Sequence, residues 1–494
     1  MFRGRGGRTI TAAVRRATSQ DIHSDPVNPA VVIDLRHPLV AVGGAGLLTV
    51  PWVAVVLTGA HPTTGLTVML SGLAVLGASF LLAWAAETAE KDVPRSFAIA
   101  VLAVLAVAPE YAVDALYAWT AGAQAGTARG VEAGNLAVAN MTGANRILIG
   151  LGWSGIALFT LWRAKRVADV SVQHRDGFLA DVVSLDRGIA IEICFLAAAT
   201  LWAFFVPFGG GIDAVDTVIL VGLYALYIVI ILRAGIEVEE EHIGVPAYLQ
   251  TYRRPKRIAT VLGLFLYSGA MIMIAVEPFA HGLESLGVAV GVPKFFMIQW
   301  IAPLASESPE LIVVTVLVLK SRSTAGFNAL ISSKLNQWTL LIGTLAVVYS
   351  IALGGYGVLE FEFKQSLEIW ITAAQSYFAL AILSNLNISG REAVALLVLF
   401  VSQVLLEFAF LRLLPEGTLE SILAALPTGP LLGTAPEHAG EALSHLTLEA
   451  YTVVYVLLGT ALFVRRRKAV AELVTIAGAT ARQAIGRSPA PEAD

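Results

Sequence analysis

The sequence predicts an all-α polytopic membrane protein of about 12 transmembrane helices, built from two inverted five-helix repeats plus flanking helices. Hydrophobic residues make up 56% of the 494-residue chain and charged residues only 14%, against about 25% charged in soluble domains. The mean hydropathy is +0.73. Apolar stretches of bilayer-spanning length, about 20 residues, recur along the chain, and a Pro-Glu pair occurs inside two of them, at 109–110 and 309–310.

The chain divides into segments that follow from its apolar stretches and its polar breaks. A basic cytoplasmic tail at 1–37 and an extra N-terminal transmembrane helix within 38–63 precede a first inverted repeat at 64–233. A cytoplasmic linker at 234–257 leads to the second repeat at 258–411, then to an external loop at 412–446, a C-terminal transmembrane helix at 447–464 and a cytoplasmic tail at 465–494. The individual spans are expected near 38–60, 64–87, 96–122, 131–162, 188–207, 213–233, 258–280, 292–319, 326–353, 367–385, 391–411 and 447–464.

Loop charges predict how these spans are oriented. Lys and Arg concentrate in the cytoplasmic loops of membrane proteins. Counting from an inner N-terminus places the basic clusters at 163–166, 253–257 and 465–468 on the inside and leaves only scattered cations outside. We therefore expect an integral protein of the plasma (inner) membrane of a prokaryote, with both termini cytoplasmic. A net charge of −4 without a basic, aromatic pattern gives no indication of a nucleic-acid partner.

The two Pro-Glu pairs lie in helices that are predicted to run in opposite directions. The pair at 109–110 falls in the third span and the pair at 309–310 in the eighth, so their span numbers differ by five, an odd number. Burying a carboxylate at bilayer depth costs several kcal/mol, so a carboxylate found there usually has a function. Proline frees a backbone carbonyl one turn back. Broken helices with acids, in inverted repeats, are typical of transporters that bind cations near the midplane.

Further polar side chains share helix faces with these acids. Glu110 and Asp114 lie one turn apart, and Glu307 and Glu310 are three residues apart, so each pair can face one point. A polar helix follows each pair, and the second of these helices presents Ser333 and Gln337 on one face. Carboxylate, hydroxyl, amide and carbonyl oxygens together form an all-oxygen site that suits hard cations such as Ca²⁺ or Na⁺.

This constellation resembles the calcium:cation antiporter (sodium/calcium exchanger) superfamily, with atypical alpha-repeats. Members of that superfamily carry a Ser-x-Pro-Glu-Leu word on one helix of each inverted repeat and a Gly/Ser/Asn word on the next helix. Residues 306–311, Ser-Glu-Ser-Pro-Glu-Leu, match the first word, whereas 106–111 match it only at Pro109-Glu110. Residues 143–145 and 332–334 match the second word in part.

The resemblance implies a secondary active antiporter, not an enzyme, that exchanges Ca²⁺ for Na⁺ or H⁺ by alternating access. It implies inorganic cations and the lipid bilayer as its partners and no cofactor beyond the transported ions. Glu110 and Glu310 become the central metal ligands, and Glu307 stands where the family usually has a hydroxyl. The full set of expected cation-binding residues is Glu110, Glu310, Glu307, Asp114, Ser306, Ser333, Gln337 and Asn140.

The chain also departs from the family pattern, chiefly in the first repeat. The family's liganding Ser and last Asn fall on Ala144 and Leu148, which offer no side-chain oxygen. Two fixed cations, Lys334 and Arg146, stand on the polar helices and are expected to modulate the charge of the pocket, more as ion-pair partners than as ligands. If Lys334 faced the pocket it could pair with Glu307 or Glu310 and disfavour sodium coupling.

Two alternatives remain open at this level. One is a secondary transporter of another class, for an organic solute, with parallel halves. The other is a degenerate family member whose ion site is occupied by Lys334 and Arg146. Outside the two words, acids such as Glu192 and Glu407 lie near predicted span ends and are expected to reach water.

Overall fold

The computed structural model describes residues 37–92, 108–234, 244–425 and 438–486. Within these ranges, 11 helices are long and apolar enough to cross a membrane. The twelfth predicted span, 96–122, begins outside the described residues, and its described part is the helix α5, Ala108–Ala123. The predicted all-α polytopic membrane fold is therefore confirmed, and the expected tail at 1–37 lies almost wholly outside the described residues.

The first half of the chain, up to residue 234, contains the helices of the first repeat, preceded by the extra helix α1. These elements are α1 Pro38–Thr58, α2 Thr64–Ala89, α5 Ala108–Ala123, α6 Ala128–Ile147, the π-helix η2 Leu148–Trp153, α7 Ser154–Ala164, β1 Val172–Gln173, β2 Val182–Ser184, η3 Arg187–Ile189, α8 Ala190–Ala203, η4 Val206–Gly209, β3 Gly211–Ile212 and α9 Ala214–Ala234.

The second half repeats this order and adds three helices after it. These elements are α10 Val245–Leu249, α11 Arg254–Val290, α12 Lys294–Phe296, η5 Met297–Ile301, α13 Ala302–Leu319, α14 Ser323–Asn336, η6 Gln337–Leu341, α15 Ile342–Leu353, β4 Leu359–Glu360, α16 Phe363–Leu383, β5 Asn387–Ser389, α17 Gly390–Phe408, η7 Ala409–Leu413, α18 Glu416–Ala425, α19 Ala439–Arg465 and α20 Arg467–Gly486.

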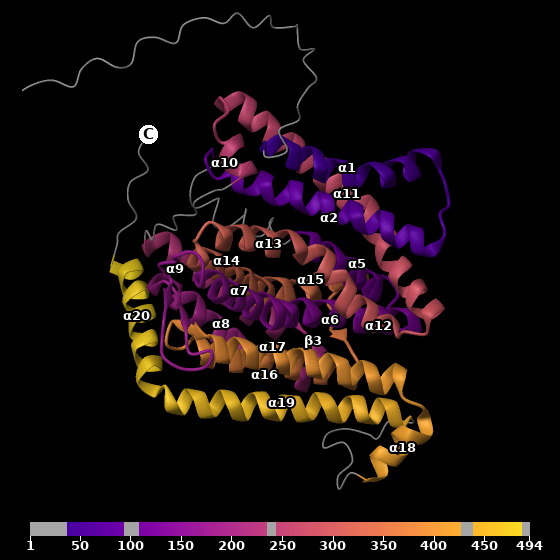
Figure 1. The fold of residues 1–494 in the computed structure, drawn as a ribbon. Helices are drawn as coiled ribbons and strands as arrows, with labels where there is room; N and C mark the ends of the chain where they lie inside the picture. Colours follow the sequence, from indigo (N-terminus) through magenta and orange to yellow (C-terminus); the bar gives the residue numbers. More distant parts are fainter. Residues whose placement is uncertain (1–36, 93–107, 235–243, 426–437, 487–494) are drawn as a thin grey trace, which may run out of the picture.

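The helices form layers that run roughly parallel to one another (Figure 1). On one side α1, α2 and α11 pack together, and on the opposite side α16 and α17 pack with the added helix α19. The shorter helices α5, α6, α7, α13, α14 and α15 fill the space between these layers. The polar words predicted from the sequence lie on these central helices, so they are in the interior of the molecule.

The two repeats interlock through the helices that bear the polar words. The helix α5 of the first repeat packs against α15 of the second, and α6 packs against η5. Glycine permits the closest approaches: a Cβ at Gly143 would lie 1.8 Å from the carbonyl oxygen of Gln299, and one at Gly122 would lie 2.2 Å from that of Tyr349. Two small antiparallel sheets, β1-β2-β5 and β3-β4, also join residues of the first repeat to residues of the second.

The broken helices have π-helical segments at their breaks. The segments η2, η5 and η6 interrupt α6–α7, α12–α13 and α14–α15. A π-helical turn widens the helix locally and occurs most often at functional sites. In α6–α7 and α14–α15 the π-helical segment follows the predicted polar word, whereas η5 lies before the word in α13. The helix break expected at Pro309 is not found, because Pro309 lies inside the continuous helix α13.

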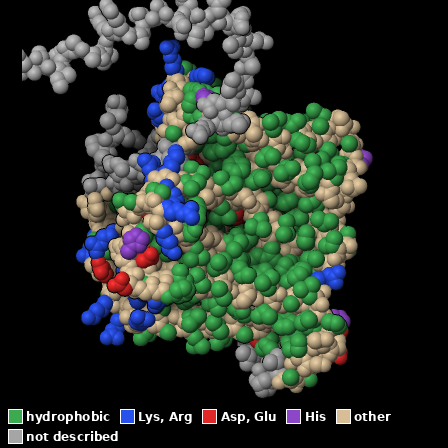
Figure 2. All heavy atoms as spheres, in the orientation of Figure 1, with side chains coloured by type: hydrophobic (Ala, Val, Ile, Leu, Met, Phe, Trp, Pro, Cys, Tyr) green, Lys and Arg blue, Asp and Glu red, His purple; other side chains and the backbone are tan. Residues whose placement is uncertain are grey.

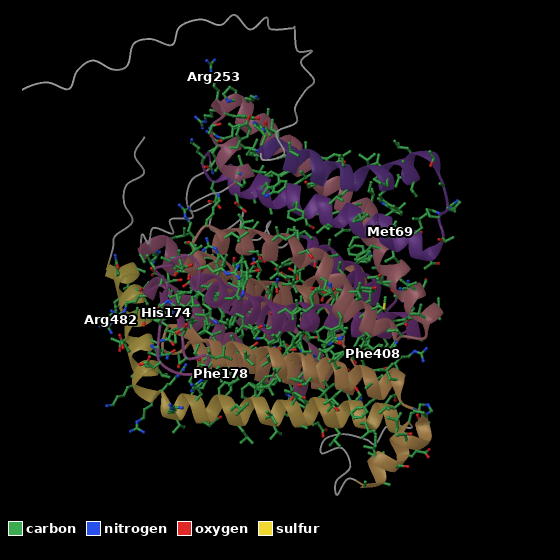
Figure 3. All side chains as sticks on the ribbon, viewed as in Figure 1. Met69, His174, Phe178, Arg253, Phe408 and Arg482 are labelled. Atoms are coloured by element: carbon green, nitrogen blue, oxygen red, sulfur yellow. The ribbon has the colours of Figure 1, made fainter. Side chains whose placement is uncertain are left out.

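One end of the molecule carries most of the basic side chains, and we call it the Arg-rich end. Figure 2 shows Lys and Arg gathered there, on the left of the view, next to a broad field of hydrophobic side chains. Arg253, His174, Phe178 and Arg482 lie at this end, whereas Met69 and Phe408 lie toward the other (Figure 3). Here Arg257 of α11 binds Asp92, with Nε–Oδ2 and Nη2–Oδ1 distances of 2.6 Å, and these bonds hold the pKa of Asp92 below its ordinary value.

Candidate functional site

A carboxylate pair from the two repeats meets in the interior on one amide group. The Nε2 atom of Gln337 in η6 donates to Glu110 Oε2 of α5 at 2.7 Å and to Glu307 Oε1 of α13 at 2.6 Å. All three side chains are buried. The Glu110 and Gln337 side chains each keep one oxygen, Oε1, without a hydrogen-bond partner among the described residues. Two carboxylates and unused amide and carboxylate oxygens therefore face a common space.

The sequence predicted this meeting only in part. It predicted Glu110 and Glu310 as the central pair, but in the structure it is Glu307 that shares a donor with Glu110. Glu310 is half-buried and accepts a hydrogen bond of 2.9 Å from Ser333 Oγ of α14. The Gln337 amide thus connects the two repeats, while the Ser333–Glu310 contact stays within the second repeat.

Two other predicted site residues form a pair one turn further along α5. Asn140 Nδ2 of α6 donates to Asp114 Oδ1 at 2.9 Å, and both side chains are 1% exposed. Asp114 Oδ2 and Asn140 Oδ1 have no partner among the described residues. Ser306, by contrast, donates to the carbonyl oxygen of Pro303 in its own helix at 3.3 Å. The first repeat therefore contributes a polar pair beside Glu110 despite the apolar residues Ala144 and Leu148.

Lys334 is fully buried but does not neutralise the carboxylates directly. Its Nζ atom donates to Asn145 Oδ1 at 2.8 Å and to the Asn145 carbonyl oxygen at 3.3 Å. It also lies 4.4 Å from the centre of the Trp338 ring, a distance at which a cation is attracted to the face of an aromatic ring. Among the described residues Lys334 forms no hydrogen bond or ion pair with Glu307 or Glu310, the pairing that would follow if it faced the pocket.

Arg146 points away from Glu110 and Asp114 into a second buried network. Its Nη1 atom lies 2.5 Å from Glu368 Oε2 of α16, and both side chains are 1% exposed. The other guanidinium nitrogen, Nη2, donates to Gln403 of α17. Gln299 Nε2 of η5 donates to the same Glu368 oxygen at 2.7 Å. Arg146 is therefore an ion-pair partner, as weighed from the sequence, but with an acid that the sequence analysis did not select.

Glu407 belongs to this second network, and the expectation that it reaches water is wrong. It is fully buried, lies 3.3 Å from Lys364 Nζ, and accepts hydrogen bonds from Gln403 and Ser444. Glu192 is likewise buried, with Tyr227 donating to it at 3.0 Å. The signal that could have found Glu368 and Glu407 is charge balance, because a buried arginine inside the membrane requires an acid nearby.

The chemistry of the donor set suits a cation that is bound and released. No group of three or more His, Cys, Asp or Glu side chains is placed to hold a metal ion in the part of the chain that the structure describes. The donors that converge are instead two carboxylates on separate repeats and the side chain of Gln337. Such a site supplies charge and oxygen ligands to a hard cation without enclosing it in a rigid cage, as transport requires.

An all-helical fold of two interlocked, inverted repeats with buried acids at their interface defines a membrane transporter of the exchanger class. The sequence profile of the sodium/calcium exchanger protein family matches residues 63–233 and 260–409. The chain belongs to this sodium/calcium exchanger family. The alternative of an organic-solute transporter with parallel halves is thereby set aside. The first span, α1, and the last, α19, lie outside the matched residues.

Solved structures resemble this chain to different degrees. A crystal structure of an H⁺/Ca²⁺ exchanger, CAX, has 40% sequence identity and a TM-score of 0.75, and the match covers 90% of this chain and 98% of that one. A Ca²⁺/H⁺ antiporter protein, YfkE, has 14% identity and a TM-score of 0.51, with 74% of this chain and 98% of that one covered. This second likeness shows the fold alone. The comparison with curated proteins found no match.

Proposed function

We propose that the protein exchanges Ca²⁺ for H⁺ across the membrane by alternating access. The observation that carries this proposal is the pair Glu110 and Glu307, which come from opposite repeats and share the amide of Gln337. The 40% identical CAX protein is described as an H⁺/Ca²⁺ exchanger, which supports the same pairing of ions. The cation and the proton compete for the same two carboxylates, so the exchange is coupled.

In the proposed cycle each side chain has a defined task. Glu110 and Glu307 bind the dehydrated Ca²⁺ through carboxylate oxygens, and Gln337 rotates its amide so that Oε1 faces the ion. When the ion leaves, protons bind to the carboxylates, and the amide nitrogen of Gln337 again donates hydrogen bonds to both of them. Glu310, with Ser333, forms the adjacent position along α13, and Asp114 with Asn140 forms the corresponding position along α5.

Buried Lys334 supports protons over sodium as the coupling ion. Its amino group fills the space beside Asn145, in a polar helix where the family resemblance would put neutral ligands. A sodium ion placed there would clash with this amino group and would lose the Asn145 oxygens as ligands. Protons need no such oxygen cage, since they bind to a carboxylate directly.

The remaining assignments of this proposal concern topology. The Arg-rich end faces the cytoplasm of a prokaryotic cell, since basic loops are retained on that side. Both termini then lie inside, and the repeat boundaries are those expected from the sequence, 64–233 and 258–411. The proposal also requires that the two repeats move relative to each other around Gln337, which contacts both.

Flux in proteoliposomes tests the proposed function. Reconstituted protein should take up ⁴⁵Ca²⁺ when an outward proton gradient is imposed and much less under an equal sodium gradient. Glu110→Gln and Glu307→Gln should each reduce this uptake more than tenfold, a change of about 1.4 kcal/mol or more in binding or transport. Glu192→Gln is the matched control, because Glu192 is also buried and is bound to Tyr227 away from the site; it should stay within about twofold of the wild type.

Three outcomes would count against the proposal. Unchanged uptake in Glu110→Gln and Glu307→Gln would refute the site. Uptake driven by sodium and not by protons would refute the coupling ion. If folded protein carries no Ca²⁺ flux under either gradient, the result would favour the degenerate family member whose ion site is occupied by Lys334 and Arg146. In that case Lys334→Met should restore cation binding.

A further inference from the structure

A cavity of about 720 Å³ opens at the Arg-rich end, away from the carboxylate site. It lies among the end of α16, the start of α17, the last turns of α19 and the β1–β2 hairpin. Its volume is in the range of natural ligand pockets, about 300–1,000 Å³. Phe178 of the hairpin, at this end of the molecule in Figure 3, accepts a hydrogen bond from Arg391 Nε through its carbonyl oxygen.

The lining of this cavity has a surplus of positive charge. Four arginines and two acids line it, a difference of two charges. One arginine and one acid cancel, because Arg466 of α19 pairs with Glu392 of α17. The remaining charged groups of the lining are three arginines and one acid, Asp176. The arginines, Arg175, Arg391 and Arg465, make no ion pair in the described ranges of the chain.

Arg466 fixes one wall of the cavity by joining the end of α16 to the start of α17. Its Nη1 atom donates to the carbonyl oxygens of Ala381 and Ile382 at the end of α16 and, at 3.1 Å, to Asn385 Oδ1. Glu392, its partner, also completes the capping box at the start of α17 with Ser389. The start of α17 is therefore already capped, and the lining guanidinium groups are not needed to cap it.

The other wall of the cavity is apolar and continues toward the membrane. Leu458, Ala461 and Leu462 follow one another on a face of α19, and Phe378 of α16 lies opposite. Leu458 is 42% exposed, and the surface beyond it on α19 includes further exposed apolar side chains. A ligand that contacts both walls of the cavity must combine an anionic head with an apolar chain.

We propose that this cavity binds the headgroup of an anionic phospholipid, whose phosphodiester lies among Arg175, Arg391 and Arg465 and whose acyl chain runs along α19 over Leu458. Basic pockets between transmembrane helices are suited to anionic lipid headgroups, and Arg binds phosphate oxygens through two parallel N–H groups. A bound lipid would hold the added helix α19, outside the family match, against α16 and α17 of the second repeat.

Lipid binding to the purified full-length protein tests this site without any transport measurement. Phosphatidylglycerol, phosphatidylcholine and glycerol phosphate are added to delipidated protein in detergent, and binding is followed by native mass spectrometry and by the thermal unfolding midpoint. Phosphatidylglycerol should bind and raise the midpoint, while the other two should not. Phosphatidylcholine carries no net charge, because its choline cation offsets the phosphodiester and would be repelled by the arginines, and glycerol phosphate lacks the acyl chain.

Charge variants locate the site. Each arginine near an anionic lipid contributes roughly a fivefold factor in affinity, so Arg391→Gln with Arg465→Gln should weaken phosphatidylglycerol binding about 25-fold. The matched control, Arg253→Gln with Lys256→Gln, removes two exposed charges from the same end of the molecule but outside the cavity; it should change binding less than twofold. Ala461→Phe, which fills the apolar wall, should weaken binding while leaving every charge in place.

Equal loss of binding in the two charge pairs would overturn the proposal, because it would show attraction to the whole basic surface. Equal stabilisation by glycerol phosphate would also overturn it, since the site would then serve a soluble anion. Unchanged binding in Ala461→Phe would show that the acyl chain does not use the α19 face. None of these results depends on which ions the protein transports.

Discussion

The buried pair of Arg146 and Glu368 provides a quantitative test of the structure. Both side chains are 1% exposed, and Arg146 also donates to Gln403. Replacing one member of a buried ion pair leaves the other charge unpaired and costs about 3–5 kcal/mol. Arg146→Gln and Glu368→Gln should each therefore destabilise the protein by that amount.

The double variant distinguishes a structural pair from a transport role. Removing both charges leaves two neutral amides, so that neither variant side chain leaves an unpaired buried charge behind. Arg146→Gln/Glu368→Gln should therefore recover most of the loss, with a coupling free energy of about 2 kcal/mol or more.

Thermal unfolding in detergent, with equal lipid content for all four proteins, measures the cycle. A loss of about 3 kcal/mol lowers the midpoint by about 3 °C in a chain of this length, because the entropy of unfolding grows with the number of residues. Additive losses in the double variant, or an Arg146→Gln protein as stable as the wild type, would refute the ion pair. Loss of Ca²⁺ binding in Arg146→Gln with stability intact would place Arg146 in the cation site.

The remaining predictions concern packing and pH. Gly143→Ala should prevent close packing of α6 on η5, because its Cβ would lie 1.8 Å from the Gln299 carbonyl oxygen, and should lower the yield of folded protein in size-exclusion chromatography; Gly155→Ala, with no atom within 4 Å of its Cβ, should fold normally. The hydrogen bonds from Arg257 lower the pKa of Asp92. The contribution of this pair to stability is therefore complete above the unfolded pKa, near 4, and disappears as pH falls through the folded pKa. The wild type should lose more stability than Asp92→Asn between pH 6 and pH 3, and equal losses would contradict the pairing.

The membrane character and the repeat could be predicted from local sequence. Apolar runs interrupted by basic loops define the spans because bilayer thickness fixes their length. The two Pro-Glu pairs indicated inverted repeats because the numbers of their spans, three and eight, differ by an odd number. Asp114 and Asn140 were selected as site candidates, and their direct contact agrees with the predicted neighbouring helices.

The partner of each buried charge could not be predicted from sequence. Spacing along one helix shows which residues share a face, but not which way that face is turned. The rotation of α13 places Glu307, and not Glu310, on the amide that holds Glu110. The rotation of α6 likewise turns Arg146 toward Glu368, which lies 222 residues away in the chain.

The sequence by itself therefore determined the membrane fold, the antiparallel repeats and the polar residue types available at their interface. Only the tertiary structure decided which of those residues meet, and it added the network of Glu368 and Glu407 and the basic cavity beside α19. The physical reason is that helix periodicity is local, whereas the rotation and depth of each helix are set by the apolar packing of all its neighbours.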